Sequence, residues 1–356
     1  GEPPEDGTSL ASMLIRVSIP GTDPTGGPNP APGFGGQLQT RATIGALPEA
    51  SVTIAYAIDT FYFADGTPYA LRVPTYTMVS PYMAIPAGML MSPRVAPAVL
   101  GLGLLEAVPE SEILEYADPN DANHDSIRGM ANYVWDVQQQ KLVLGRFGWK
   151  AGQPSVLQQT AGAFNQDMGM TNKLFPQESC YGQSQYSCIP LSQKGTDITD
   201  SLLSAAAFYV SSIGVPARRN LSDPTVMRGE LLFKQAGCAS CHRQTMTTGV
   251  NEARPSVSNQ IIFPYTDLLL HDMGPGLTDN RPEFLANGQQ WRTPPLWGIG
   301  LTQLVNGHTY FLHDGRARSL MEAVMWHGGE AEGAKEAVVH FSAADRAALI
   351  KFLQSL

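Results

Sequence analysis

The sequence predicts a mostly α-helical protein with a small β-hairpin region and long loops. Apolar residues recur at helical spacing in several segments, whereas strand-like alternation is confined to one stretch near the start. The chain also holds 35 glycines and 27 prolines among 356 residues, which requires many shaped turns. The expected helices are 95–106, 110–117, 155–164, 200–212, one that begins at Pro224, and one that closes the chain.

The composition excludes several classes of protein. The formal net charge of −9 disfavours a nucleic-acid partner, because such partners require a basic face. Hydrophobic residues make up 43% of the chain, which is enough for a large core. No apolar run reaches the roughly 18 residues of a membrane span. The longest candidate, Val95–Val108, is short and contains Glu106, so we expect a protein that does not span a membrane.

The first part of the chain holds the expected β structure. Residues 1–36 are rich in Gly and Pro and are expected to form an extended surface arm, with strand character only over Met13–Val17. Residues 51–80 alternate apolar and polar side chains on both sides of Asp65-Gly66. An Asp-Gly pair between two such runs is typical of a β-hairpin.

Capping residues mark the two helices that bracket the C-terminal part. Asp223 precedes Pro224, which is a capping side chain followed by proline in the first turn. Ser342 and Asp345 form an approximate capping box before the apolar stripe of the last helix. We therefore expect a C-terminal domain of residues 223–356 and an N-terminal domain of residues 1–222.

Between these helices lies the sequence Cys238-Ala-Ser-Cys241-His242. C-x-x-C-H is the attachment sequence of c-type haem, in which both thiols add to the haem vinyl groups and the histidine ligates the iron. Half a zinc site and a redox C-x-x-C are the alternatives. Zinc needs two more ligands, and the other cysteines lie far upstream. A thioredoxin-like motif would follow a strand, whereas a helix is expected here. Haem is therefore the preferred interpretation.

The other two cysteines, Cys180 and Cys188, are not followed by histidine and lie in a polar stretch. A local disulfide that closes a surface loop is the simplest expectation. Covalent haem and a disulfide both indicate an oxidising compartment, so we expect an exported, periplasmic protein. Gly1 is not a start residue, and the chain is expected to be mature, processed or trimmed.

Asp121, Asn123 and Asp125 alternate as in the first half of an EF-hand loop. With the carbonyl of Ile127 they could surround a calcium ion. Ser126 replaces the usual glycine, and position 12 is not glutamate. A polar turn rich in Asx residues is the alternative interpretation.

Five motifs extend over much of the chain. They are SPRVAP at 92–97, YTDLLLHDMG at 265–274, WRTPPLWGIG at 291–300, LHDGRARSL at 312–320 and WHGGEAE at 326–332. Together they resemble the di-haem c-type cytochrome oxidoreductases, often labelled thiol oxidoreductases. These are distant relatives of the bacterial di-haem cytochrome c peroxidases and of the di-haem enzyme that matures methylamine dehydrogenase. The segment Arg228–Cys238 also resembles the first helix of a class I cytochrome c, which implies that fold for the C-terminal domain.

Members of this family carry two C-x-x-C-H sites, and this chain carries one. The resemblance implies that the first site and a second haem fall just upstream of Gly1. In the peroxidases a tryptophan lies between the haems, a glutamine follows ten residues later, and an acid then assists proton movement. Trp149, Gln159 and Asp167 match this order, although Asp stands for Glu and lies closer than expected. Core packing, a helix-surface amide and a helix-end charge are their respective alternatives.

The resemblance departs at the sixth ligand of the haem that is present. Where the peroxidases have methionine before His-Asp-Gly, this chain has Leu312, which cannot coordinate iron. Met273, His271 and His313 are the candidates. Met273 is favoured because a thioether would preserve the family role, with apolar packing as the alternative. His327, beside two glutamates in a glycine-rich loop, is expected to be a propionate partner, a proton relay or a metal ligand.

The resemblance implies a peroxidase-like haem c oxidoreductase. The haem on Cys238, Cys241 and His242 would receive electrons from a small donor protein, such as a cytochrome or cupredoxin. It would pass them by Trp149 to a second haem that handles hydrogen peroxide or another small oxidant, assisted by Gln159 and Asp167. A non-enzymatic electron-transfer cytochrome and a haem-binding or iron-binding accessory protein with structural calcium are the alternatives.

Overall fold

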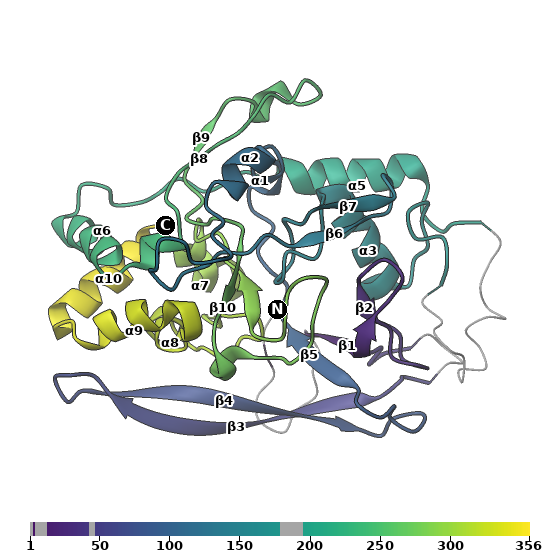
Figure 1. Cartoon of the computed structure of the whole chain (residues 1–356), viewed down its shortest axis with the longest axis horizontal. Helices are drawn as coiled ribbons and strands as arrows, with labels where there is room; N and C mark the ends of the chain where they lie inside the picture. The colour runs from purple at the N-terminus through teal and green to yellow at the C-terminus, as the bar shows by residue number, and fades with distance from the viewer. Residues whose placement is uncertain (1–2, 4–12, 43–46, 179–194) are drawn as a thin grey trace.

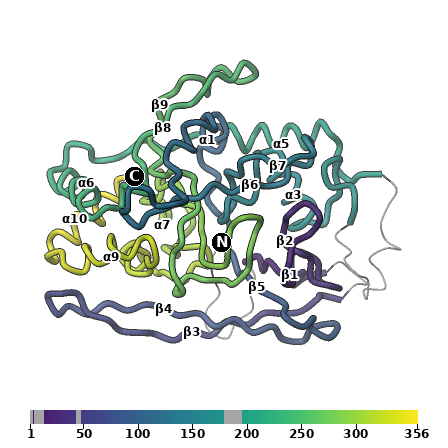
Figure 2. Tube along the Cα trace, viewed as in Figure 1, coloured from purple at the N-terminus to yellow at the C-terminus, as the bar shows by residue number. Residues whose placement is uncertain are grey.

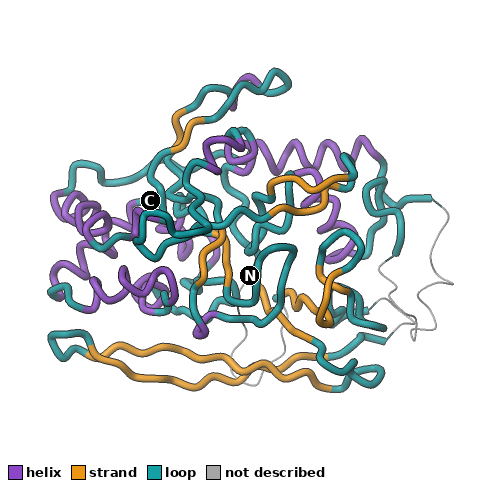
Figure 3. The backbone as a smooth tube through the Cα atoms, viewed as in Figure 1, coloured by secondary structure: helices purple, strands orange, loops and turns teal. Residues whose placement is uncertain are grey.

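The computed structural model describes residues 3, 13–42, 47–178 and 195–356 (Figure 1). Helices hold 29% of the residues and strands 21%, so the expectation of a mostly α-helical protein is wrong. The class I cytochrome c fold expected for the C-terminal part is likewise not shown. The strands form small sheets of two or three joined by long loops (Figure 3). The frequent prolines explain this, because they remove a backbone donor and interrupt helices and sheets early.

The N-terminal strands form an antiparallel sheet in which β1 (Leu14–Thr22) lies between β2 (Pro28–Asn29) and β5 (Leu90–Arg94). Successive side chains of a strand point to opposite faces. Ile15 and Val17 are accordingly buried in the N-terminal apolar core. The strand expected over 13–17 is confirmed and continues to Thr22.

The hairpin expected over residues 51–80 is confirmed. β3 (Ser51–Tyr62) and β4 (Pro68–Val79) pair without a register shift from Ser51↔Val79 to Tyr62↔Pro68. Gly66 adopts φ +82° in the connecting turn, a conformation that glycine tolerates best. Val52 belongs to the N-terminal core, whereas Phe63 and Leu71 belong to the C-terminal core. The hairpin thus spans both cores, along the lower edge in Figure 1.

The central part mixes short helices and a second hairpin. Its elements are α1 (Leu102–Glu106), α2 (Glu110–Leu114), β6 (Tyr133–Asp136), β7 (Lys141–Leu144), α3 (Val156–Met168) and α5 (Asp200–Ser212). Ser155 and Thr199 cap the last two helices by accepting backbone N–H bonds. The helix expected over 95–106 forms only at its end, because Pro97 disfavours helical backbone at Ala96 and Gly101 has a left-handed φ of +64° directly before α1.

Two helices bracket the cysteine motif as expected. The carboxylate of Asp223 caps the N-terminus of α6 (Pro224–Gln235). The hydroxyl of Ser342 caps the N-terminus of α10 (Ala343–Ser355) by accepting the Asp345 N–H. The helices pack against each other, and a Cβ on Gly229 would lie 2.0 Å from the Ala348 carbonyl oxygen. This close approach forms the C-terminal apolar core.

The remaining elements are short and lie between α6 and α10. They are β8 (Met246–Thr247), η2 (Pro255–Val257), β9 (Ile261–Ile262), β10 (Leu270–Asp272), η3 (Pro275–Leu277), β11 (Gln290–Arg292), η4 (Ile299–Leu301), α7 (Thr302–Asn306), α8 (Leu320–Met325), η5 (Gly329–Ala331) and α9 (Glu332–Val339). β8 and β9 form the base of an arm that projects from one side (Figure 2). Among the described residues, no helix has both the length and the apolarity to cross a membrane. The division at residue 222 stays a prediction.

Candidate functional site

The two cysteines of the C-x-x-C-H motif lie on one tight turn directly after α6. Gly237 adopts φ +82°, which ends the helix and leads into the 3-10 turn η1 (Cys238–Ser240). Cys238 and Cys241 are free thiols and half-buried. Burial raises the pKa of the Cys238 thiol to about 12 and also raises that of Cys241. Both therefore remain neutral thiols in the protein.

His242, the last residue of the motif, is held in one tautomer. Its Nδ1 lies 2.9 Å from the backbone oxygen of Tyr265, and a carbonyl can only accept, so Nδ1 carries the proton. Burial lowers the pKa of His242 to about 4, so the ring is neutral and its Nε2 lone pair is free. This arrangement suits an imidazole that ligates a metal.

Tyr265 positions the carbonyl that orients His242. Its backbone has φ +54°, an uncommon conformation for a non-glycine residue. The Tyr265 ring is anchored between α6 and α10, with centroids 6.1 Å from Phe233 and 5.8 Å from Phe352. The packing of the two helices thus fixes the position of the Tyr265 carbonyl and, through it, the orientation of the His242 ring.

The residues present fit a covalently attached haem. Two thiols on one turn and a neutral imidazole with a free Nε2 are the donor set that c-type haem requires. In addition, the buried Nε1 of Trp326 has no hydrogen-bond partner. Trp326 and Cys238 pack against the same apolar core. A buried N–H without a partner beside an apolar surface suits a ligand with both apolar and acceptor groups, as haem has.

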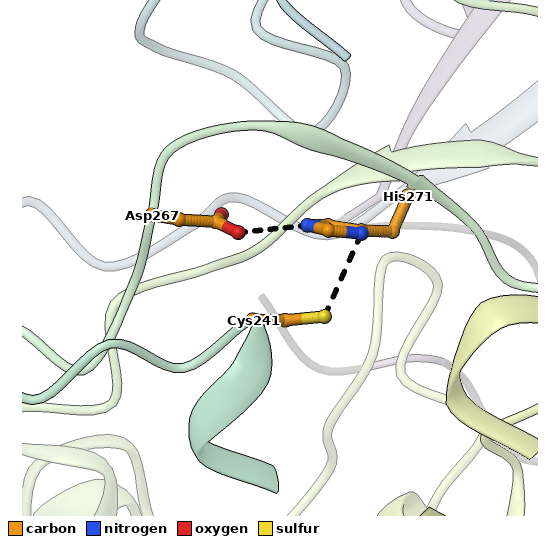
Figure 4. A group of neighbouring side chains, drawn as sticks. All are labelled: Cys241, Asp267 and His271. Atoms are coloured by element: carbon orange, nitrogen blue, oxygen red, sulfur yellow. Dashed lines mark hydrogen bonds and ion pairs between the residues drawn. The ribbon is translucent and has the colours of Figure 1, made fainter. Parts of the chain in front are cut away.

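A second imidazole, His271 at β10, lies in a buried network beside the motif (Figure 4). Its Nε2 is 2.8 Å from Asp267 Oδ2, and its Nδ1 is 2.6 Å from Glu330 Oε2 and 3.5 Å from Cys241 Sγ. Burial alone would lower the pKa of His271, but Asp267 and the hydrogen bonds, including that of Glu330, raise it well above its ordinary value. The raised pKa favours the protonated ring, and both nitrogens are engaged. A role of His271 as an iron ligand stays a prediction.

Three side chains of this network are also close enough to hold a metal ion. Ligand atoms of Cys241, Asp267 and His271 lie within 4.8 Å of one another, the one such group among the described residues. The protonated ring offers no lone pair, so these side chains form a hydrogen-bond network in this state. Sequence reasoning missed Asp267 and Glu330. Asp267 lies four residues before His271, but Glu330 lies 59 residues after it and no local pattern links them.

The other ligand candidates differ in their surroundings. His313 is buried and stacks on Trp291 with ring centroids 3.8 Å apart, and burial lowers its pKa to about 3. Met273 directly follows β10, and its backbone N–H donates to the Gln289 oxygen. Its role as an iron ligand stays a prediction.

The three residues expected to serve a second haem lie in the N-terminal half. Trp149 packs against the N-terminal core and its Nε1 donates to the Val95 oxygen at 2.8 Å. Gln159 lies in α3, and its buried Oε1 has no partner. Asp167 is exposed near the end of the same helix. No hydrogen bond or ion pair joins the three within the described part of the chain, and their catalytic roles stay predictions.

The loop expected to bind calcium is stabilised by its own backbone. Side-chain oxygens of Asp121, Asn123 and Asp125 accept N–H bonds from Ser126, Asp125 and Ile127 at 2.8–3.0 Å. These contacts are those of the Asx-rich turn, and calcium has no support in them. The expected disulfide between Cys180 and Cys188 lies outside the described residues.

Taken together, the thiol pair, the oriented neutral imidazole and the apolar surroundings define a protein with a haem-binding site. The family described as "Di-haem oxidoreductase, putative peroxidase" matches residues 21–356, and the chain belongs to this family. The suspected di-haem oxidoreductase family is thereby confirmed. The family implies haem as the cofactor and a peroxidase-like oxidoreductase as the class. No curated protein and no solved structure matches the chain.

Proposed function

We propose that this protein is a periplasmic haem c oxidoreductase of peroxidase type. Haem is attached through Cys238 and Cys241, and His242 ligates its iron. One observation carries the proposal: directly after the two thiols, Nδ1 of His242 donates to the Tyr265 oxygen at 2.9 Å. That bond leaves Nε2 free for iron, and no other contact of His242 in the described chain competes for it.

Bound haem supplies the one-electron and peroxide chemistry, and the chain supplies attachment, orientation and electrostatics. Cys238 and Cys241 hold the porphyrin edge on one turn. Tyr265 keeps the His242 ring in the tautomer that ligates. The His271 cation places a positive charge beside Cys241, although Asp267 and Glu330 balance it.

A second haem belongs to the proposal because the family is a di-haem family. Its C-x-x-C-H would lie upstream of Gly1, and Trp149, Gln159 and Asp167 would serve it. The unpartnered buried Oε1 of Gln159 supports this assignment, because a buried amide oxygen normally accepts a hydrogen bond. The donor partner would be a small cytochrome or cupredoxin, and the net charge of −9 favours one with a basic face.

The test is to express the chain with a cytochrome c maturation system and to count covalent haem. The protein should carry one haem that stays attached during denaturing electrophoresis. Its absorption spectrum should be that of a haem attached through two thioether bonds. Cys238→Ala with Cys241→Ala should carry none, whereas Ser240→Ala should be unaffected. A wild-type chain without covalent haem would contradict the proposal.

Peroxide assays on a longer precursor that includes an upstream C-x-x-C-H then test the enzyme class. Oxidation of a reduced small cytochrome by peroxide supports a peroxidase. A fully loaded protein that exchanges electrons but is inert to peroxide would instead indicate the electron-transfer cytochrome.

A further inference from the structure

Two histidines of the C-terminal part have the same local chemistry. Nδ1 of His242 donates to the Tyr265 oxygen at 2.9 Å, and Nδ1 of His327 donates to the Ala323 oxygen at 2.8 Å. Each bond fixes the proton on Nδ1 and leaves the Nε2 lone pair free. Within the described residues, neither Nε2 has a partner. Both side chains are half-buried.

Two contacts hold the loop 326–331 against the attachment turn. Glu330 Oε2 lies 2.6 Å from His271 Nδ1, and the same nitrogen lies 3.5 Å from Cys241 Sγ. One imidazole therefore separates this end of the loop from the attachment turn. At the other end, Trp326 packs against the same apolar core as Cys238. His327 lies between these two anchors.

Two glycines allow the loop to approach so closely. A Cβ on Gly329 would lie 2.3 Å from the Asp272 oxygen, and one on Gly328 would lie 3.0 Å from the Met273 oxygen. Any side chain at Gly329 would push the loop away from β10.

We propose that His327 Nε2 would be the second protein ligand to the iron of a haem held by Cys238, Cys241 and His242. The inference rests on the proposed haem attachment at Cys238 and Cys241. Neutral imidazole is a common iron ligand, and its Nδ1 bond to a carbonyl strengthens it as a donor. The rival imidazoles are engaged elsewhere: His271 between two carboxylates, and His313 stacked on Trp291.

Low-temperature electron paramagnetic resonance of the haem-loaded chain tests the proposal. The oxidised wild type should give a low-spin signal typical of two imidazoles. His327→Ala should lose that signal, become high-spin, and recover it on addition of free imidazole. His327→Met should stay low-spin and shift the reduction potential upward, because thioether ligation raises it. This second variant keeps the test valid if alanine destabilises the loop.

Two further variants separate ligation from general disturbance. His340→Ala removes a ring with the same bond to a carbonyl four residues earlier, 3.0 Å from Glu336 O, but on the surface. It should leave the spectrum unchanged. Met273→Leu tests the rival ligand predicted from the sequence, and it should stay low-spin if His327 ligates the iron. A low-spin His327→Ala protein, a high-spin wild type, or a Met273→Leu protein that turns high-spin would each overturn the ligand assignment. Haem content measured on the same samples separates these outcomes from failure of haem attachment, which would overturn the proposed function itself.

Discussion

Two buried polar regions of the described chain can be compared by how completely their groups are satisfied. In the first, Lys150 is fully buried, and its Nζ lies 2.8 Å from Asp279 Oδ1 and 3.0 Å and 2.7 Å from the oxygens of Arg281 and Asn287. All three ammonium protons have acceptors. Around Cys241, by contrast, His242 keeps a free Nε2 and Trp326 keeps an unpartnered indole N–H.

The difference separates structural polar groups from groups that await a ligand. A buried polar atom without a partner costs free energy, so its presence requires a compensating role. Lys150 has no such atom, although Arg94 Nη2 and Arg281 Nε nearby lack a hydrogen-bond partner within the described residues. Its contacts hold the loop between β7 and α3 against the loop after η3. The Cys241 region leaves donors and lone pairs open where a cofactor fits. Three variants test this distinction.

The largest effect is expected from Lys150→Met. Removal of the ammonium takes one donor from Asp279 and from each of two backbone carbonyls, which should cost about 3–5 kcal/mol of unfolding free energy. Burial lowers the pKa of Lys150 to about 8 even though Asp279 opposes the shift. Urea denaturation measures the change. Lys173→Met is the matched control, because its ion pair with Asp200 at 3.0 Å is exposed and should be worth less than about 1 kcal/mol. Equal losses in both variants would contradict the structural role.

His313→Phe should change the dependence of stability on pH. Burial lowers the folded-state pKa of His313 to about 3, below its unfolded value of about 6.5. As pH falls below about 6.5, only the unfolded chain gains the proton, so His313 costs ~2 kcal/mol of stability by pH 5. Phenylalanine keeps the stacking on Trp291 and removes this loss.

Thermal unfolding at pH 8 and pH 5 measures the difference. The variant should lose less stability than the wild type on acidification, whereas His340→Phe, a change at an exposed ring, should follow the wild type. An unchanged acid dependence in His313→Phe would show that His313 is not held neutral.

The smallest effect is expected from Asp267→Asn. Its cost in stability should be larger at low pH and smaller at high pH. The folded-state pKa of His271 is raised, so its ion pairs stabilise the protein fully below the unfolded pKa and are lost as pH rises through the folded pKa. Loss of the charged partner should cost about 1.5 kcal/mol near pH 6 and much less at alkaline pH. Asp272→Asn is the control. The Asp272 carboxylate accepts the Gly274 N–H, and within the described residues no hydrogen bond or ion pair joins its side chain to His271. A penalty independent of pH would argue against a cationic His271.

Local sequence patterns predicted the elements whose determinants are local. The hairpin at 51–80 followed from alternation around Asp65-Gly66, and the starts of α3, α6 and α10 followed from Ser155, Asp223 and Ser342. The helix expected from Val95 is wrong over most of its length, because Pro97 disfavours helical backbone at Ala96 despite the apolar periodicity. The helical share was overestimated for the same reason.

The candidate site was predicted only in part. The C-x-x-C-H motif predicted the attachment residues, since their chemistry depends on spacing within five residues, and covalent attachment stays a prediction. Tyr265 supplies a backbone oxygen, and nothing in a side-chain pattern marks it. Glu330 reaches His271 across 59 residues, a contact set by packing of η5 against β10. Such long-range pairs require the tertiary structure.

The hairpin that spans both cores has a consequence for the order of folding. Arg346 in α10 pairs with Asp65 at 2.7 Å across 281 residues and stacks on Phe63 at 3.9 Å. Closing so large a loop is entropically costly and slow, so this docking follows the local helices. Until α10 is in place, the hairpin has no C-terminal core to cover. We expect the cysteine turn to remain accessible during that interval, when an attachment enzyme can reach both thiols.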